Sequence, residues 1–357
     1  MRYWKTNNSQ ILTESPPDYP YFKTAYDFGR AWLSGQETFS FKTSGSTGVP
    51  KLITVQKAQL QSSARMTSLA LELPKGTKAL VCLSVEYIAG IMMLVRGLEI
   101  GWDLTVIEPS GNPLLDTPPL EKFDFIAMVP LQLVNSLQND STRARVDAVG
   151  KILLGGAPVA ASLFRDVQQL KVPVYQSYGM TETVSHIALR RINGENVTSD
   201  YTVLAGVEFG TDSRGCLFVE GAVTDYKRVQ TNDLVKITSN RTFEWIGRAD
   251  SIINSGGVKI QLDKVDRMLE DVLLDLNLSF DFFHWYREDE RLGQKLILFV
   301  KSTPAEFPSE FVLEELKCRV IPYEVPKAVY FVDSFAKTPT DKLDKRATAA
   351  HYYTAKK

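Results

Sequence analysis

The chain has 357 residues, a formal net charge of −1 at pH 7, and 44 % hydrophobic and 23 % charged residues. This length allows about two or three domains with sizeable cores, and the nearly neutral charge argues against a general nucleic-acid or membrane-surface binder, which would carry a basic excess. No apolar run reaches the roughly 18 residues of a membrane span, and the N-terminus lacks the apolar core of a signal peptide. The chain has three widely spaced cysteines and three histidines. These are too few to favour disulfides, a zinc site or a histidine-based catalytic triad. We therefore expect a cytoplasmic protein with reduced thiols.

The first forty residues are polar and aromatic, and we expect a lead-in to a core rather than a domain. Beyond them, amphipathic segments alternate with short β-branched apolar runs. We expect helices at 57–72, 87–99, 131–138 and 160–170, and strands at 78–83, 104–107, 125–129 and 151–154. This alternation predicts an α/β fold with a mostly parallel wound sheet, whose ligands bind beyond the carboxyl ends of the strands.

From about residue 200 the sequence pattern changes to that of short strands separated by turns, which predicts a β subdomain. Its strands are expected at 203–209, 215–219, 233–237 and 242–246. A small α+β domain follows, with an amphipathic helix starting near Leu262, a hairpin over 280–300, a helix at 308–319 and a strand at 328–332. We place the boundary between an N-terminal domain, 1–249, and a C-terminal domain, 250–357.

Residues 43–51, Thr-Ser-Gly-Ser-Thr-Gly-Val-Pro-Lys, predict a phosphate-binding loop. Its glycines allow the backbone N–H groups to approach an anion, and hydroxyls and a lysine add donors and charge. The alternative is a plain Gly/Ser turn. The candidate ATP ligands of this loop are Thr43, Ser44, Gly45, Ser46, Thr47, Gly48 and Lys51.

Three later motifs complete a pattern. Residues 178–182 read Tyr-Gly-Met-Thr-Glu, residues 247–257 run from Gly-Arg-Ala-Asp to Asn-Ser-Gly-Gly, and residues 337–342 read Lys-Thr-Pro-Thr-Asp-Lys. In this order they resemble the motifs of the acyl-adenylate-forming superfamily, which includes acyl-CoA synthetases, firefly luciferase and peptide-synthetase adenylation domains. The resemblance runs from about residue 40 to the end.

The resemblance implies that ATP activates a carboxylic acid as acyl-AMP and that coenzyme A then accepts the acyl group. The phosphate loop would hold the β- and γ-phosphates, Thr181 would bind the α-phosphate, and Glu182 would hold Mg²⁺. One carboxylate suffices because Mg²⁺ keeps most of its waters and phosphate oxygens. The alternative for Thr181 is a helix N-cap.

By the same resemblance, small residues and a tyrosine would flank the adenine. Asp233 would accept hydrogen bonds from both ribose hydroxyls, with Arg248 assisting, and Asp250 would be the hinge about which a mobile C-terminal domain rotates. As alternatives, the glycines form a plain turn and Asp250 lies in a simple surface turn. The candidates around the adenine are Gly155, Gly156, Ala157, Pro158, Tyr178 and Gly179.

Lys342 matches the adenylation lysine of the family, although Lys337 and Lys345 are close enough to confuse an assignment from sequence. The alternative is a solvated lysine-rich loop. Asp341 replaces the usual glycine of this motif.

The sequences of residues 177–185 and 253–257 look most like the corresponding motifs of o-succinylbenzoate–CoA ligases of menaquinone synthesis. Gly90, Arg96 and Gly101 keep the spacing of a cationic residue in those enzymes, so Arg96 would pair with the succinyl carboxylate. The alternative is a helix residue that points to solvent, although apolar neighbours would make an unpaired arginine costly.

The remaining acid-site candidates are Ser185, His186, Ser255, Gly256 and Tyr87. His186 could equally be a satisfied core histidine, and Tyr87 stands where a histidine is common in the family. The chain resembles a short form without the usual N-terminal subdomain. Three functions stay open: an o-succinylbenzoate–CoA ligase, a ligase for another acid, and an inactive nucleotide-binding module. A homodimer is one possible assembly.

Overall fold

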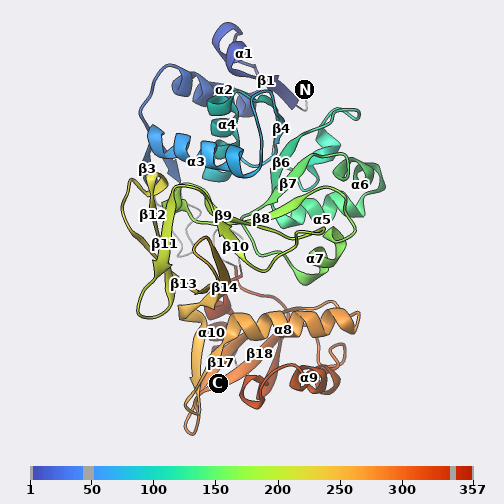
Figure 1. Ribbon diagram of the computed structural model, residues 1–357. Helices are drawn as coiled ribbons and strands as arrows, with labels where there is room; N and C mark the ends of the chain where they lie inside the picture. The colour runs from blue at the N-terminus through green and yellow to red at the C-terminus, as the bar shows by residue number, and fades with distance from the viewer. Residues whose placement is uncertain (1–2, 43–51, 338–342, 356–357) are drawn as a thin grey trace.

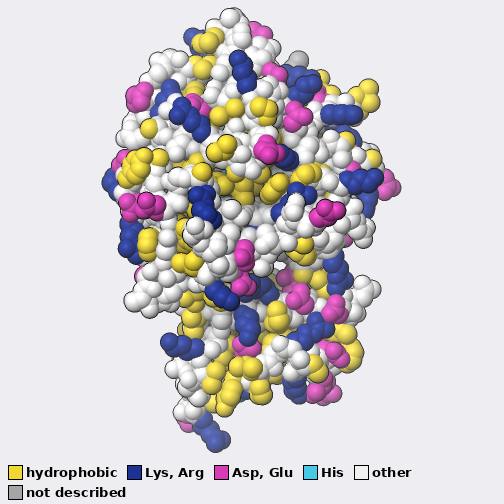
Figure 2. Space-filling model, viewed as in Figure 1, with side chains coloured by type: hydrophobic (Ala, Val, Ile, Leu, Met, Phe, Trp, Pro, Cys, Tyr) yellow, Lys and Arg dark blue, Asp and Glu magenta, His cyan; other side chains and the backbone are white. Residues whose placement is uncertain are grey.

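The computed structural model describes residues 3–42, 52–337 and 343–355. In Figure 1 the chain up to about residue 250, blue to yellow, forms a large upper part, and the orange and red C-terminal residues form a smaller lower part. Acidic and basic side chains are interspersed over the face shown in Figure 2. None of the helices in the described ranges is long and apolar enough to cross a membrane.

The first residues build part of the large domain. They form β1 (Tyr3–Thr6), α1 (Asn8–Thr13), α2 (Pro20–Leu33) and a two-stranded sheet of β2 (Thr38–Lys42) and β3 (Leu52–Gln56). Phe22 and Trp32 of α2 are buried in the same core as the central helices. This segment is therefore a covering layer and not a domain of its own.

The centre of the large domain is a parallel sheet in the order β5-β4-β6-β7-β8. Its strands are β4 (Lys78–Val81), β5 (Asp103–Ile107), β6 (Phe125–Met128), β7 (Lys151–Leu154) and β8 (Val174–Gly179), and the helices are α3 (Lys57–Ala70), α4 (Ile88–Ile100), α5 (Pro130–Gln138), α6 (Asp140–Val146) and α7 (Ala161–Val167). One hydrophobic core packs α2, α3 and α4 on one face of the sheet, and a second packs the helices that follow β6 on the other. The predicted α/β fold is confirmed.

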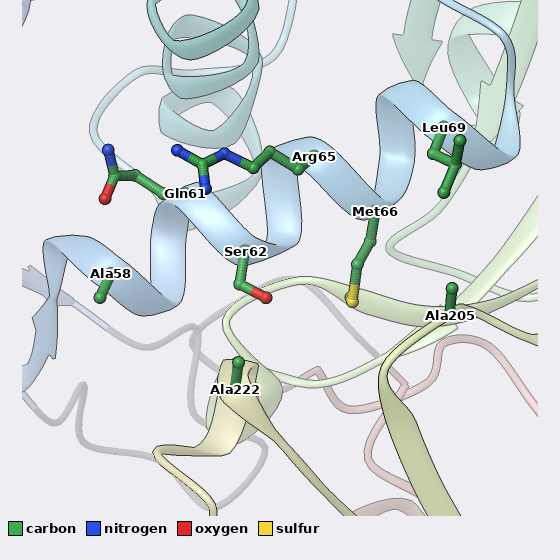
Figure 3. A pocket seen from close by; sticks show the side chains of 8 residues that line it. All are labelled: Ala58, Gln61, Ser62, Arg65, Met66, Leu69, Ala205 and Ala222. Atoms are coloured by element: carbon green, nitrogen blue, oxygen red, sulfur yellow. The ribbon is translucent and has the colours of Figure 1, made fainter.

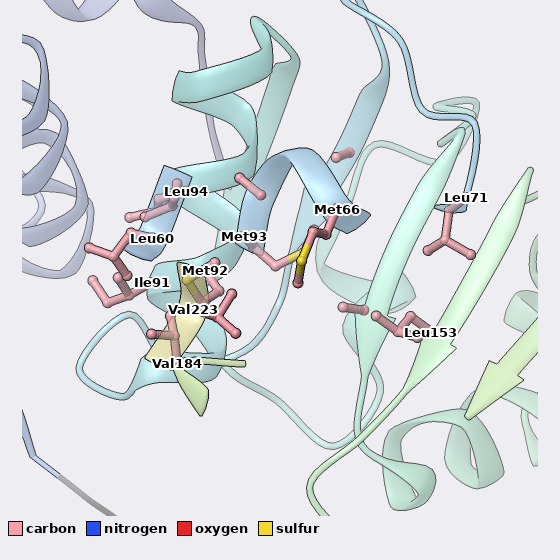
Figure 4. Close-up of a cluster of buried hydrophobic side chains, with 14 of the residues drawn as sticks. Leu60, Met66, Leu71, Ile91, Met92, Met93, Leu94, Leu153, Val184 and Val223 are labelled. Carbon is pink, nitrogen blue, oxygen red and sulfur yellow. The ribbon is translucent and has the colours of Figure 1, made fainter. Parts of the chain in front are cut away.

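The core on the first face is tight around α3 and α4. Figure 4 shows their apolar side chains, among them Leu60, Met66 and Met92, together with Val184 and Val223 from distant parts of the chain. Any polar group inside this layer therefore needs a partner of its own.

The sheet does not stop at β8. With β1 paired antiparallel to β5 at the opposite edge, six further antiparallel strands beyond β8 complete one mixed sheet of twelve strands. They are β9 (His186–Arg191), β10 (Tyr201–Val203), β11 (Val207–Thr211), β12 (Cys216–Gly221), β13 (Val229–Ile237) and β14 (Thr242–Arg248). The expected β subdomain is thus hydrogen-bonded to the wound sheet through the antiparallel β8–β9 pair. That pairing was invisible in the sequence because it depends on a turn at residues 180–185.

The small domain has a five-stranded sheet with helices on both faces. Its elements are β15 (Ile252–Ser255), β16 (Val258–Gln261), α8 (Leu262–Asp275), β17 (Asp281–Asp289), β18 (Gly293–Lys301), α9 (Ser309–Lys317), β19 (Ala328–Val332) and α10 (Lys345–Ala355). The apolar face predicted for α8 is buried, including Leu262, Val265 and Leu269. The expected hairpin, second helix and last strand are present, whereas β15, β16 and α10 were not anticipated.

A few polar contacts join the two domains where α7 lies beside α8 (Figure 1). The backbone N–H of Ala161 donates to Oε1 of Glu270 at 2.9 Å, and Nη2 of Arg165 lies 3.1 Å from Oδ1 of Asp275. Nη2 of Arg267 donates to the carbonyl of Ile246 at 2.7 Å. The proposed domain boundary falls between β14 and β15, in the short helical turn η4 (Ala249–Ser251).

Candidate functional site

Small residues follow β7 at the carboxyl edge of the parallel strands. Gly156 has φ +80° and is exposed, with Ala157 and Pro158 exposed after it. A Cβ on Gly155 would lie 2.7 Å from Oγ of Ser177, at the end of the neighbouring β8. Gly155 therefore leaves room for Ser177, and the exposed backbone of residues 156–158 is the part of this turn that a ligand can approach.

Tyr178 and Asp233 are brought together from strands 55 residues apart. The Tyr178 hydroxyl donates to Oδ2 of Asp233 at 2.7 Å, and Nε1 of Trp245 donates to Oδ1 at 3.3 Å. Burial, reinforced by the carboxylate, raises the pKa of Tyr178, so its hydroxyl keeps its proton. The Tyr178 ring stands edge-on to Phe243 with a centroid distance of 5.3 Å. Trp245, which orients Asp233, was not among the predicted site residues.

Arg248 turns mainly towards Asp250. Its Nε and Nη2 each donate to one carboxylate oxygen of Asp250 at 2.9 Å, and these bonds lower the pKa of that carboxyl. Nη1 of Arg248 lies 3.8 Å from Oδ1 of Asp233. Arg248 therefore neighbours the predicted ribose carboxylate, while its two-pronged contact ties it to the predicted hinge residue.

Thr181 and Glu182 lie in the short helical turn η2 (Thr181–Thr183) that follows β8. The residue that caps this turn is Met180, so the alternative interpretation of Thr181 as an N-cap is wrong; Oγ1 of Thr183 receives the Met180 N–H at 3.1 Å. Glu182 is exposed, and within the described residues its carboxylate makes no hydrogen bond or ion pair. Across those residues, no three His, Cys, Asp or Glu side chains gather as metal ligands. A single exposed carboxylate fits an Mg²⁺ ion carried by phosphates.

The chain leaves this turn through Val184, whose φ is +66°. A β-branched residue in this region is strained, because its branched side chain crowds the backbone. Val184 is nevertheless buried in the core shown in Figure 4. The surrounding packing therefore enforces a sharp bend between Thr181 and Ser185.

Arg96 is buried on α4, and its hydrogen-bond partners among the described residues are all uncharged. Nη2 donates to Oγ of Ser185 at 3.0 Å, Nε donates to Oγ1 of Thr67 at 3.3 Å, and Nη1 lies 3.6 Å from the sulfur of Met93. Burial lowers the pKa of Arg96 to about 10, which leaves the guanidinium charged at neutral pH. The alternative that Arg96 points to solvent is wrong.

His186 lies beside this guanidinium. Its Nδ1 is 3.5 Å from Nη2 of Arg96, and its Nε2 is 3.0 Å from Oγ1 of Thr67. Burial, with the positive charge of Arg96 as a second cause, holds the pKa of His186 well below its usual value, so the ring is neutral. Thr67 was missed in the sequence, where a threonine inside a helix carries no local signal.

The pairing of β8 with β9 connects the Tyr178–Asp233 pair to the residues around Arg96. Gly179 is the register partner of His186, and the register shifts between Tyr178 and Gly179. A Cβ on Gly179 would lie 2.5 Å from Cα of His186 and closer still to the carbonyl oxygen of Ser185. This close approach needs glycine. It places the Tyr178 end of β8 next to a group of residues that we call the Arg96 cluster: Arg96, Thr67, Ser185 and His186.

Other predicted residues lie elsewhere. Tyr87 precedes α4 with 47 % of its surface exposed. Ser255 ends β15 of the small domain, and Gly256 follows it in a turn, where its N–H donates to the carbonyl of Leu292 at 2.8 Å. The structure therefore does not bring Ser255 and Gly256 into the Arg96 cluster. The predicted phosphate loop, 43–51, and Lys342 lie outside the described residues.

The structure does describe Lys345, the neighbouring lysine that could be confused with Lys342 in the sequence. Its Nζ lies 2.6 Å from Oδ2 of Asp266 and 4.0 Å from Oδ1 of Asp263. Asp266 also accepts from His284 at 2.7 Å. Lys345 thus anchors α10 to α8, which leaves it poorly suited to the role assigned to Lys342.

A pocket of about 400 Å³ opens on the other side of α3 (Figure 3). Ser62 and Met66 of α3 face Ala205 and Ala222 across it. Thr67 lies on the opposite face of the same helix, so this pocket is separate from the Arg96 cluster.

Comparisons with known proteins fit this geometry. The model of the family described as AMP-binding enzyme matches residues 39–208. A solved structure, the acyl-CoA synthetase (AMP-forming)/AMP-acid ligase II-like protein from Dyadobacter fermentans, is 52 % identical in sequence; the match has a TM-score of 0.70 and covers 98 % of this chain and 99 % of that chain. The chain belongs to the AMP-binding enzyme family.

This AMP-binding enzyme is also similar to 2-succinylbenzoate–CoA ligase from Bacillus cytotoxicus, with 25 % identity over 85 % of this chain and 68 % of the relative. Its fold matches that of o-succinylbenzoate CoA synthetase from Bacillus subtilis, solved with the acyl-adenylate intermediate, at 21 % identity and a TM-score of 0.69. That match covers 85 % of this chain and 67 % of the other. The predicted family is confirmed.

Proposed function

We propose that this acyl-adenylate-forming enzyme is an o-succinylbenzoate–CoA ligase of menaquinone biosynthesis. The observation that carries the acid assignment is Arg96. Its guanidinium is buried among uncharged partners, and no carboxylate of the described residues pairs with it. The similarity to succinylbenzoate ligases supports the same substrate.

An unpaired cation inside an apolar layer is costly to keep. Neutral hydrogen bonds recover part of its lost hydration, but an anion recovers far more because the local dielectric is low. A substrate with a second carboxylate supplies that anion. Arg96 would therefore select dicarboxylic acids by holding the carboxylate that does not react.

The reacting carboxylate of the acid attacks the α-phosphorus of ATP and forms acyl-AMP, and pyrophosphate leaves. The CoA thiolate then attacks the acyl carbon, and AMP leaves with the carboxylate oxygen that it had gained. On the nucleotide side, we assign Tyr178 to the adenine and Asp233 to the ribose hydroxyls. Arg248 stands ready to assist, as its distance of 3.8 Å to Asp233 permits.

Glu182 and Thr181 would face the phosphates from the turn after β8. Bound Mg²⁺ would neutralise phosphate charge there, with Glu182 as its protein ligand. Lys342 keeps the role of adenylation lysine, because Lys345 is engaged by Asp266. We further propose that the small domain rotates about Asp250 between the two half-reactions, and that the enzyme works in the cytoplasm.

Pyrophosphate release from Mg-ATP tests the proposal directly. The acids are o-succinylbenzoate, benzoate, succinate, a medium-chain fatty acid and several amino acids. We expect release with o-succinylbenzoate, and a loss of about a hundredfold in kcat/KM for Arg96→Met, since a charged hydrogen-bonded pair is removed. Arg143→Met, the same change at an exposed position of α6, is the matched control.

Each outcome decides something. If a monocarboxylic acid is turned over as efficiently as o-succinylbenzoate, the proposed substrate and the role of Arg96 are wrong, whereas the adenylation chemistry still stands. ATP binding without pyrophosphate release on any acid would favour an inactive nucleotide-binding module.

A further inference from the structure

Three groups converge on one hydroxyl, Oγ1 of Thr67 on α3. Nε of Arg96 lies 3.3 Å from it, Nε2 of His186 lies 3.0 Å from it, and the carbonyl oxygen of Ser63 lies 3.0 Å from it. All four residues are buried. The Thr67 hydroxyl therefore connects Arg96, His186 and the Ser63 carbonyl in one buried hydrogen-bond network.

The protons in this network can be assigned by elimination. The Ser63 carbonyl can only accept, and Nε of Arg96 can only donate. If Thr67 gives its one proton to Ser63, then Nε2 of His186 must donate to Thr67. Nδ1 of His186 then presents a lone pair to Nη2 of Arg96 and to the Ser185 hydroxyl, each 3.5 Å away, whereas the other tautomer would place a proton beside the guanidinium cation. Only the first arrangement satisfies every contact.

This network also fixes which edge of Arg96 is open. Nε donates to Thr67 and Nη2 donates to Ser185, while Nη1 contacts the weakly accepting sulfur of Met93 at 3.6 Å. A guanidinium binds a carboxylate through two parallel donors. The Nη1–Nη2 edge is thus the one that a carboxylate can take, with exchange of the Ser185 contact.

We propose that Thr67 is the positioning residue of the acid site: it holds Nε of Arg96, keeps His186 as the Nε2–H tautomer, and so presents the Nη1–Nη2 edge to the second carboxylate of the substrate. This inference rests on the proposed function. A second observation supports a polar ligand at this wall, because Oγ of Ser63, one helical turn before Thr67, is buried without a partner among the described residues.

The test compares Thr67→Val, which keeps the shape and removes the hydroxyl, with Thr67→Ser, which keeps the hydroxyl. For Thr67→Val we expect KM for o-succinylbenzoate to rise about tenfold, since one hydrogen bond to a charged group is lost. The values of kcat and of KM for ATP should change little, and Thr67→Ser should restore the wild-type KM. Thr24→Val is the matched control, because Thr24 makes the same helical contact, to the carbonyl of Pro20, without an arginine or histidine partner.

The ¹⁵N resonances of His186 report the tautomer independently of turnover. We expect the Nε2–H form in the wild type and in Thr67→Ser, and a shift towards Nδ1–H or a mixture in Thr67→Val. If Thr67→Val does not fold, Thr67→Ala, which also lacks the hydroxyl, takes its place.

The outcomes separate the two proposals. Failure of the wild type to turn over o-succinylbenzoate, with the expected tautomer change, would overturn the substrate but leave Thr67 as the residue that sets His186 and Arg96. An Nδ1–H tautomer in the wild type would overturn the positioning role, and so would an unchanged KM in Thr67→Val.

Discussion

The neutral His186 ring predicts a specific weakness of the fold in mild acid. In the folded chain, burial and Arg96 hold its pKa well below 6.5, whereas in the unfolded chain the ring regains its ordinary pKa. Below pH 6.5 the unfolded state therefore binds a proton that the folded state does not, and the free energy of unfolding falls as the pH falls. Each pH unit costs up to about 1.4 kcal/mol, so the change from pH 7 to pH 5 removes about 2 kcal/mol through this residue.

Urea unfolding at pH 7 and pH 5 measures this term when the wild type is compared with His186→Gln. Glutamine keeps an amide donor but does not titrate, so the loss of stability between the two pH values should be smaller by about 2 kcal/mol. His351→Gln is the control, because His351 lies exposed on α10. Equal losses in the wild type and in His186→Gln would refute a neutral, buried His186.

Two further predictions concern the end of β8. Gly179→Ala should destabilise the fold by about 1–3 kcal/mol and abolish activity, because its Cβ meets the backbone of Ser185 and cannot be relieved by a side-chain rotation. Thermal unfolding checks this against Gly111→Ala, whose Cβ meets only an amide side chain at 3.2 Å. Tyr178→Phe should raise KM for ATP about tenfold and leave KM for the acid unchanged, because Asp233 loses a hydroxyl donor. Steady-state kinetics with both substrates tests this, and an unchanged KM for ATP would contradict the placement of Tyr178 and Asp233 at the nucleotide.

Much of the fold could be predicted because local patterns determine it. The strand expected at 151–154 matches β7, and the helix expected at 57–72 ends two residues early at Ala70. The helix α2 was missed, although Pro20 at its first turn and the spacing of Phe22, Tyr26 and Trp32 are helix signals. The abundance of aromatic and proline residues concealed this periodicity.

The site was less accessible to sequence reasoning. Motif order led to Tyr178, Asp233 and Arg96, yet the partners that orient them are distant in sequence. Thr67 lies 119 residues from His186, and only the packing of α3 against the β8–β9 turn brings them together. Trp245 lies on β14 as an ordinary strand residue until the register places its indole against Asp233. Such pairings depend on tertiary structure, which no local pattern encodes.

The contacts between α7 and α8 are part of what holds the two domains together. The Arg165–Asp275 ion pair leaves both side chains more than half exposed, and such a pair contributes at most about 1 kcal/mol. The proposed rotation about Asp250 would therefore begin by breaking bonds that water readily replaces. Because salt screens exposed charges, ionic strength should loosen this resting arrangement and shift the balance between the domain positions without touching either substrate site.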